Sequence, residues 1–268
     1  MKKIYDNNGN LFAELNYSKE YFQNYSKHSH ETFGLSIIQE GKIEVEFHSQ
    51  EKLYLQENKI VVFNPNQVHI TKSAIKENYN YYTLHVNTNY CKKIQTSIFG
   101  ENDNFIDVKN LIENKDLYSK LLNIFEQILL EKDSIKTEIL EELISDIIKE
   151  YTNLDSLKLV NDKNNKLFKD IEQYIINNIE NPISLEDIAL NVGYNESYIS
   201  RVFKKKYGLT PHAFLVNKRV EKAKNKMLDN KTISLAQLSN EAGFYDQSHF
   251  SKVFKRVFAI SPNKYRLD

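Results

Sequence analysis

The sequence predicts two domains of different secondary structure: an N-terminal antiparallel β-barrel or sandwich followed by two helices, and a C-terminal all-α domain. The chain has 268 residues, which is long enough for two domains with separate cores. Short apolar runs with period-two alternation lie between Glu31 and Val86 and indicate strands. Beyond residue 165 apolar residues follow a helical period, and a segment that starts at Ser184 recurs, with changes, from Ser234.

Three stretches supply the predicted strands. FGLSIIQEGKIEVEF is interpreted as two strands joined at Glu40-Gly41, and KIVVFNPNQVHI as a strand broken at Asn64-Pro65-Asn66. The Tyr-rich YNYYTLHV adds another. Short strands with tight turns are typical of an antiparallel barrel, which we place at about residues 10–90 within a first domain of residues 1–151.

Two amphipathic helices are predicted between residues 111 and 151, with a break at Asp133-Ser134. Their apolar stripes can pack against the barrel or form a homodimer interface, and the sequence leaves both open. The first stripe comprises Leu117, Leu121, Phe125, Ile128 and Leu129, and the second Ile139, Leu143, Ile147 and Tyr151.

The charge is divided unevenly along a chain whose formal net charge is zero. Residues 1–164 carry 19 Lys and Arg against 25 Asp and Glu, whereas residues 165–268 carry 17 against 11. A polar linker is predicted at 152–166, ahead of the basic domain at 167–268. The basic half suits a polyanionic partner, although lysines that merely solvate helices would give the same balance.

Other classes of protein are disfavoured by composition. A lone cysteine, Cys91, rules out an intrachain disulfide and is expected to be inert in a reducing compartment. There is no apolar run of bilayer-spanning length and no signal-peptide pattern, so a cytoplasmic protein with no membrane partner is expected. We find no phosphate-binding loop and no nucleophile motif, and we predict no catalytic residues and no cofactor.

The repeated segment has the pattern of a helix-turn-helix. Ser184 is placed to cap one helix, Gly193 suits the tight turn that follows, and Asn195 is placed to cap the next helix. The second copy follows the same plan, with Asp246 as the cap. In the second helix of each copy polar and basic residues form the outer stripe, whereas the inward residues are Ile199, Val202 and Phe203, or Phe250, Val253 and Phe254.

Residues 165–268 resemble the DNA-binding region of the AraC/XylS family of bacterial transcription regulators. The connecting helix has Arg219 and Ala223 where the family has its Arg and Ala, but Ser239 replaces an alanine and Ala259 stands where Gly208 stands in the first copy. The resemblance implies two recognition helices that read successive major-groove segments of double-stranded DNA. The matching motifs are Ala189, Gly193 and Tyr194, repeated as Gly243 and Phe244; Phe203-Lys204 and Phe254-Lys255; and Pro262, Tyr265 and Arg266.

The outward residues are assigned to bases and phosphates by matching positions and by chemistry. Arginine can bind guanine through two hydrogen bonds and glutamine can bind adenine in the same way. The residues expected to contact bases are Ser197, Ser200, Arg201, Gln247, Ser248, His249 and Lys252. Those expected to hold phosphates are Lys204, Lys205, Lys206, Lys255 and Arg256.

The first part of the chain resembles the cupin-type jelly-roll barrel of the same family, over about residues 10–90. A pocket rimmed by His28, His30, His69 and Tyr82 is expected to bind an effector, and a purely structural role for the histidines is the alternative. A three-histidine metal site, with His85 following, is disfavoured because the glutamate of metal-binding cupins is missing near Gly34-Leu35.

Three functions remain open on the sequence. The first is an effector-responsive transcription regulator, and a further resemblance, to a branch of the family that often neighbours amino-acid exporters, suggests an amino acid or similar metabolite as effector. RNA polymerase is a further candidate partner of an activator. The second function is a constitutive DNA-binding protein with the barrel as a dimerisation scaffold, and the third is a metal-dependent cupin enzyme fused to a DNA-binding domain.

Overall fold

The computed structural model describes residues 1–21, 25, 27–48, 51–73, 78–102, 104–130, 136–154, 165–230, 232–258 and 260–267. The predicted break at Asp133-Ser134, most of the predicted linker, and Ala259 lie outside these residues. The chain divides into a sheet unit, Met1–Asn24 and His30–Val160, and a helical unit, Asn161–Asp268, with which Tyr25–Ser29 is grouped. Each unit is described by itself.

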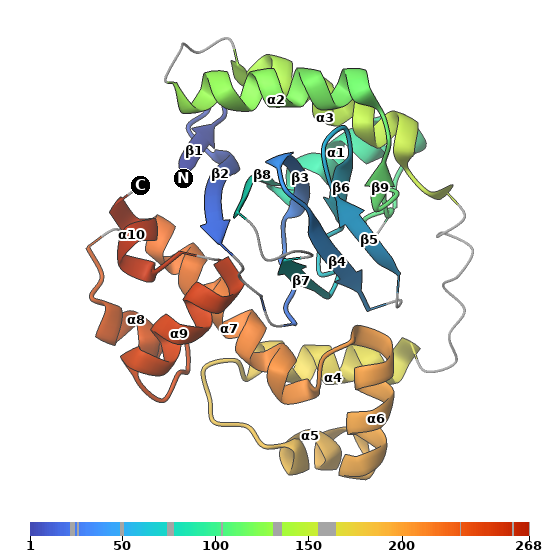
Figure 1. The fold of residues 1–268 in the computed structure, drawn as a ribbon. Helices are drawn as coiled ribbons and strands as arrows, with labels where there is room; N and C mark the ends of the chain where they lie inside the picture. The colour runs from blue at the N-terminus through green and yellow to red at the C-terminus, as the bar shows by residue number, and fades with distance from the viewer. Residues whose placement is uncertain are drawn as a thin grey trace. The chain divides into compact units, whose positions relative to one another are not determined.

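The sheet unit is built from two antiparallel sheets (Figure 1). β3 and β4 are consecutive in the chain but lie in different sheets, as in a jelly roll. No ladder joins the two sheets among the described strands, so the barrel is open. In spatial order the larger sheet has β1 (Lys2–Tyr5), β2 (Leu11–Tyr21), β8 (Asn78–Val86), β3 (Phe33–Glu40), β6 (Ile60–Phe63) and β9 (Leu111–Ile112), and the smaller has β5 (Lys52–Leu55), β4 (Ile43–Phe47) and β7 (His69–Ser73).

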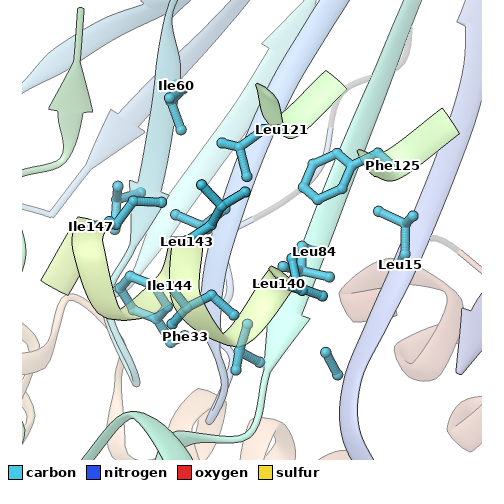
Figure 2. Close-up of a cluster of buried hydrophobic side chains, with 14 of the residues drawn as sticks. Leu15, Phe33, Ile60, Leu84, Leu121, Phe125, Leu140, Leu143, Ile144 and Ile147 are labelled. Carbon is cyan, nitrogen blue, oxygen red and sulfur yellow. The ribbon is translucent and has the colours of Figure 1, made fainter. Parts of the chain in front are cut away.

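The two faces of the larger sheet belong to separate hydrophobic clusters because side chains alternate along each strand. Phe33 and Leu84 lie on the face that packs against the helices, whereas Ile38 and Phe63 lie on the face that packs with residues of the smaller sheet. Figure 2 shows the first cluster, in which Leu15 and Ile60 of the sheet meet side chains of two helices.

Three helices follow the last long strand: α1 (Thr88–Phe99), α2 (Lys115–Leu129) and α3 (Lys136–Tyr151). Both predicted amphipathic helices are present, and their buried residues pack on the sheet (Figure 2). The predicted stripe of the second helix is wrong by one position at its start, because Ile139 is 41% exposed and Leu140 is fully buried. Residues buried in α2 are Tyr118, Leu121, Phe125 and Ile128, and in α3 Leu140, Leu143, Ile144, Ile147 and Ile148.

A short segment around Val108 is bound on both sides by hydrogen bonds. The side chain of Asn64 donates to the Val108 carbonyl and accepts from its N–H, both at 2.8 Å. On the other side, Asn153 N–H donates to the Asp107 carbonyl at 2.7 Å, next to the end of α3. The segment therefore connects the loop after β6 with the last described residues of the sheet unit.

The helical unit contains two similar modules around one long helix (Figure 1). α7 packs against helices of both modules, namely α4, α6, α8 and α9. None of the helices in the described ranges has both the length and the apolar character needed to cross a bilayer. The helices are α4 (Asn165–Asn177), α5 (Leu185–Val192), α6 (Glu196–Tyr207), α7 (Pro211–Asp229), α8 (Leu235–Glu241), α9 (Gln247–Phe258) and α10 (Pro262–Leu267).

The predicted caps are confirmed. Ser184 and Asp187 form a reciprocal capping box at the start of α5, and Asn195 accepts a hydrogen bond from the third residue of α6. Gly193 ends α5 in the left-handed conformation with φ of 74°, which a residue without a Cβ adopts at little cost. Asp246 accepts a hydrogen bond from the N–H of His249 at 2.7 Å at the start of α9.

Candidate nucleic-acid interface and histidine site

The second helix of the first module, α6, has one buried side and one exposed side. Ile199 and Phe203 are fully buried, and the Phe203 ring meets that of Phe214 on α7 with centroids 5.4 Å apart. The predicted contact residues lie opposite this core: Ser197, Arg201, Lys204, Lys205 and Lys206 are exposed, and Ser200 is half-buried.

The corresponding helix of the second module, α9, repeats the arrangement with a different surface. Phe250 and Phe254 are fully buried, and Phe254 packs edge-on against Tyr265 of α10. Every predicted contact residue of this helix is exposed, namely Gln247, Ser248, His249, Lys252, Lys255 and Arg256. The two modules thus have similar buried cores but expose different side chains to a partner.

An aromatic stack supports Arg201 on the exposed side of α6. The rings of Tyr194 and Tyr198 are stacked with centroids 5.4 Å apart, and the Arg201 guanidinium lies over the Tyr198 ring at 5.7 Å. A guanidinium over an aromatic face is stabilised by a cation–π interaction and loses side-chain freedom. Sequence reasoning omits Tyr198 from the site, although its place three residues before Arg201 on a helix is a usable signal.

A residue of the connecting helix binds the segment after α4 and lies against the turn of the second module. Arg219 of α7 donates from Nε to the Ile179 carbonyl at 2.7 Å and from Nη2 to the Asn181 carbonyl at 2.6 Å. Gly243, with φ of 80°, lies against the same group of atoms. Arg219 therefore acts as an internal tie between the end of α4 and the turn before α9.

Three histidines of the sheet unit lie close together, and we call them the histidine site: His30, His69 and His85. His30 and His69 are buried, and each offers a ring nitrogen within 4.8 Å of the other. His28 is also buried, but it lies in the segment Tyr25–Ser29 that is grouped with the helical unit. The ring centroid of His30 lies 5.5 Å from that of His69 and 4.8 Å from that of His85.

Neighbouring groups orient two of these rings. Nδ1 of His69 lies 3.0 Å from the Gln67 carbonyl, which can only accept, so Nδ1 carries a proton and donates it. Nδ1 of His85 lies 3.0 Å from the Thr32 hydroxyl. The Phe63 ring, with its centroid 4.5 Å from that of His69, forms an apolar wall.

Tyr82 does not join the histidine site. It precedes His85 by three residues on β8, so the two side chains emerge on opposite faces of the sheet. The Tyr82 ring packs with Tyr17 and Phe125 in the cluster under the helices, where burial raises the pKa of its hydroxyl to about 12. His85 lies on the other face of the sheet, and its ring is the one from β8 that lies near His30, with centroids 4.8 Å apart.

Comparison with known protein families gives one match in each of the two units. A family model described as an AraC-like ligand binding domain matches residues 17–148, and a helix-turn-helix domain model matches residues 184–268. The Transposon Tn10 TetD protein of Escherichia coli is 32% identical over 101 residues, which cover 37% of this chain and 72% of that protein. The chain belongs to the AraC family.

This AraC-family chain also resembles a longer regulator and a solved structure. The Msm operon regulatory protein of Streptococcus mutans is 28% identical over 127 residues, 47% of this chain and 45% of that protein. The chain thus spans about half the length of this curated relative. A crystal structure of an apo ToxT variant from Vibrio cholerae covers 96% of this chain and 98% of its own, with a TM-score of 0.62 and 15% identity, which shows a shared fold.

Proposed function

We propose that the chain is a sequence-specific, DNA-binding transcription regulator that responds to an effector and has no enzymatic role. The observation that carries the proposal is the pair of modules on α7, each with a fully buried aromatic core and an exposed polar and basic helix. An α-helix of this kind fits the major groove of B-DNA. The place of action would be the cytoplasm, where bacterial DNA lies.

The contact residues fall into two groups by chemistry. Ser197, Ser200 and Arg201 on α6 would read bases, as would Gln247, Ser248, His249 and Lys252 on α9. The basic residues in the last turns of the same helices, Lys204, Lys205, Lys206, Lys255 and Arg256, would hold phosphates. Because the base-reading sets differ, the two half-sites should differ in sequence.

The effector would bind in the sheet unit. The ligand-binding family model covers 17–148, and the histidine site groups buried side chains with exchangeable protons there. We propose His30 and His69 as effector contacts in this unit. His28, also expected from the sequence, lies in the segment that is grouped with the helical unit, and Tyr82 is left out because it faces the other cluster. An amino acid or similar metabolite would carry a carboxylate or amine that can form hydrogen bonds with imidazole.

A homodimer would use surfaces of α2 and α3 that their own domain leaves exposed. The buried stripes of both helices are occupied by the sheet, which favours the domain-packing alternative for those faces. Leu130 and Ile139 are exposed large apolar residues at the facing ends of the two helices. RNA polymerase would be a partner only if regulation is positive.

Selection of binding sites from a random duplex pool tests the proposal. The full chain should enrich a bipartite site with two unlike elements about one helical turn, 10–10.5 base pairs, apart. A matched variant with Arg201→Ala and Gln247→Ala together should enrich nothing. Failure of the unmodified chain to enrich any sequence, with binding to all duplexes alike, would contradict sequence-specific regulation.

A further inference from the structure

The histidine site has the composition and geometry of a metal site. Its members offer imidazole side chains, which in their neutral form are ligands that zinc, nickel, copper and ferrous ions accept. Two nitrogens on one zinc ion lie roughly 3.3 Å apart, since each Zn–N bond is about 2.0–2.1 Å and the geometry is tetrahedral. The nitrogens of His30 and His69 already lie within 4.8 Å of each other, so small ring rotations would bring them to that distance.

The ring positions agree with shared coordination. Imidazoles bound to one tetrahedral ion have ring centroids roughly 5 Å apart, given the same bond length. The centroids of His30 and His69 are 5.5 Å apart, and those of His30 and His85 are 4.8 Å apart. His85 thereby places a third imidazole beside His30 and His69.

Groups around the site prepare His69 to act as a ligand. The hydrogen bond from its Nδ1 to the Gln67 carbonyl at 3.0 Å orients the ring, as the outer-shell partner of a metal-ligating histidine does. The rings of Phe63 and Phe47 lie 4.5 and 6.3 Å from the His69 ring and limit access of water. Such an oriented imidazole with an apolar surround is what metal sites require beyond the ligands themselves.

The missing cupin glutamate is explained by the register of the sheet. Gly34, near the place where the family pattern expects that carboxylate, pairs with His85 of β8. A Cβ at Gly34 would lie 3.1 Å from Cβ of Phe63, which leaves little room for a longer side chain. On the other side of His85 the paired residue is Glu14, a buried carboxylate on the same face.

We propose that the histidine site binds one divalent first-row transition-metal ion, with His30 and His69 as essential ligands. The inference deepens the proposed effector response, because it names the ligand class of the same site. A metal ion bound there would link metal availability to the state of the sheet unit. Metal binding is measured without DNA, so a failure of the chain to bind DNA would not affect the metal result.

The experiment is a titration of the metal-free full chain with Zn²⁺ by calorimetry and with Co²⁺ by visible absorption. One ion should bind per chain, and the cobalt complex should show the intense absorption of tetrahedral coordination. His30→Gln and His69→Gln should each weaken zinc binding by at least about 100-fold, beyond the 10–100-fold loss typical of an outer-shell change. His212→Ala is the matched control, since His212 is exposed at the start of α7 and should leave binding unchanged.

Circular dichroism and thermal melting of the metal-free variants separate lost ligands from lost folding. Gln keeps much of the size and hydrogen-bonding capacity of His, so both variants should melt like the unmodified chain without metal. Only the unmodified chain and His212→Ala should gain melting temperature on addition of zinc. Absence of binding at micromolar zinc, unchanged binding in folded His30→Gln and His69→Gln, or stabilisation by amino acids but not by metal would each overturn the proposal.

Discussion

Gly243 and Arg219 are in such close contact that a single methyl group on Gly243 would collide with the arginine. A Cβ there would lie 2.8 Å from Nε of Arg219 and 2.7 Å from the Ile179 carbonyl to which Arg219 donates. Gly243→Ala should therefore lower the free energy of unfolding by about 2–4 kcal/mol, from the left-handed backbone and the overpacking together. Chemical denaturation of the full chain measures this.

Gly193 provides the control for that substitution. It has the equivalent place in the first module and a φ of 74°, but nothing lies within 4 Å of its Cβ position. Gly193→Ala should cost only the backbone strain, about 1–2 kcal/mol. Equal losses for the two variants would show that the contact with Arg219 is unimportant.

Ser239 is a buried polar residue of the second module, and we expect it to be less stabilising than alanine. Its side chain is 1% exposed, and its Oγ has no hydrogen-bond partner among the described residues, whereas the first module has Ala189 there. Removing a buried unsatisfied hydroxyl relieves a desolvation penalty of about 1–3 kcal/mol. We expect Ser239→Ala to raise the free energy of unfolding by about 1 kcal/mol. A lowered midpoint in urea would mean that the hydroxyl is satisfied.

Arg201 and Lys205 should affect DNA binding in different ways. Arg201→Ala should cost about 1–3 kcal/mol of binding to the selected site and relax its base preference. Lys205→Ala should weaken binding to all duplexes alike and lower the salt slope by about one unit. Fluorescence anisotropy on selected and random duplexes at several salt concentrations distinguishes them. An equal loss on both duplexes for Arg201→Ala would remove Arg201 from the base-reading set.

Tyr198 should act through Arg201, because its ring lies beneath the guanidinium at 5.7 Å. Tyr198→Ala should weaken binding to the selected site by about 0.5–1 kcal/mol, the usual value of an exposed cation–π pair. In the Arg201→Ala background the same change should have little effect, and a double-mutant cycle measures that coupling. Additive losses would indicate that Tyr198 contacts DNA on its own.

Cys91 should be chemically silent until the sheet unit unfolds. The thiol is fully buried in the cluster under the helices, and burial raises its pKa well above the usual range, so no thiolate is available. A thiol reagent such as DTNB should titrate no cysteine in the native chain and one in denaturant. Rapid reaction of the native chain would contradict the burial of Cys91.

The sequence predicts the helical unit better than the sheet unit. Caps such as Ser184 and Asn195 are local signals, and the structure confirms both. Helix α1 has an N-cap of the same kind, Asn87, but its buried side is not marked by apolar residues alone, because Gln95, one of its two buried side chains, is polar. Its amide binds the backbone of Ile106 at 2.6 and 2.9 Å, a partner that periodicity cannot indicate.

The histidine site is likewise predictable from the sequence only in part. The H-x-H pair and His69 can be found by residue type, but which strand neighbours complete the group depends on register. Tyr82 and His85 are three residues apart on β8, and only the pairing of β8 with β3 shows which of them faces His30. Tyr198 differs from these residues, because its spacing of three from Arg201 on a helix is a local signal, whereas its stacking on Tyr194 appears only in the structure.

The two hydrogen bonds between the Asn64 side chain and the Val108 backbone belong to a longer hydrogen-bonded path in the sheet unit. The Gln67 carbonyl orients His69, and the Gln67 side chain binds that of Asn110. Asp107 precedes Val108 by one residue, and Asn110 follows it by two. Asp107 in turn holds the backbone of Asn153, just beyond α3. His69 and Asn153 are thus connected by a short series of side-chain and backbone hydrogen bonds. A displacement of His69 would therefore be transmitted to the backbone just beyond α3 through hydrogen bonds alone.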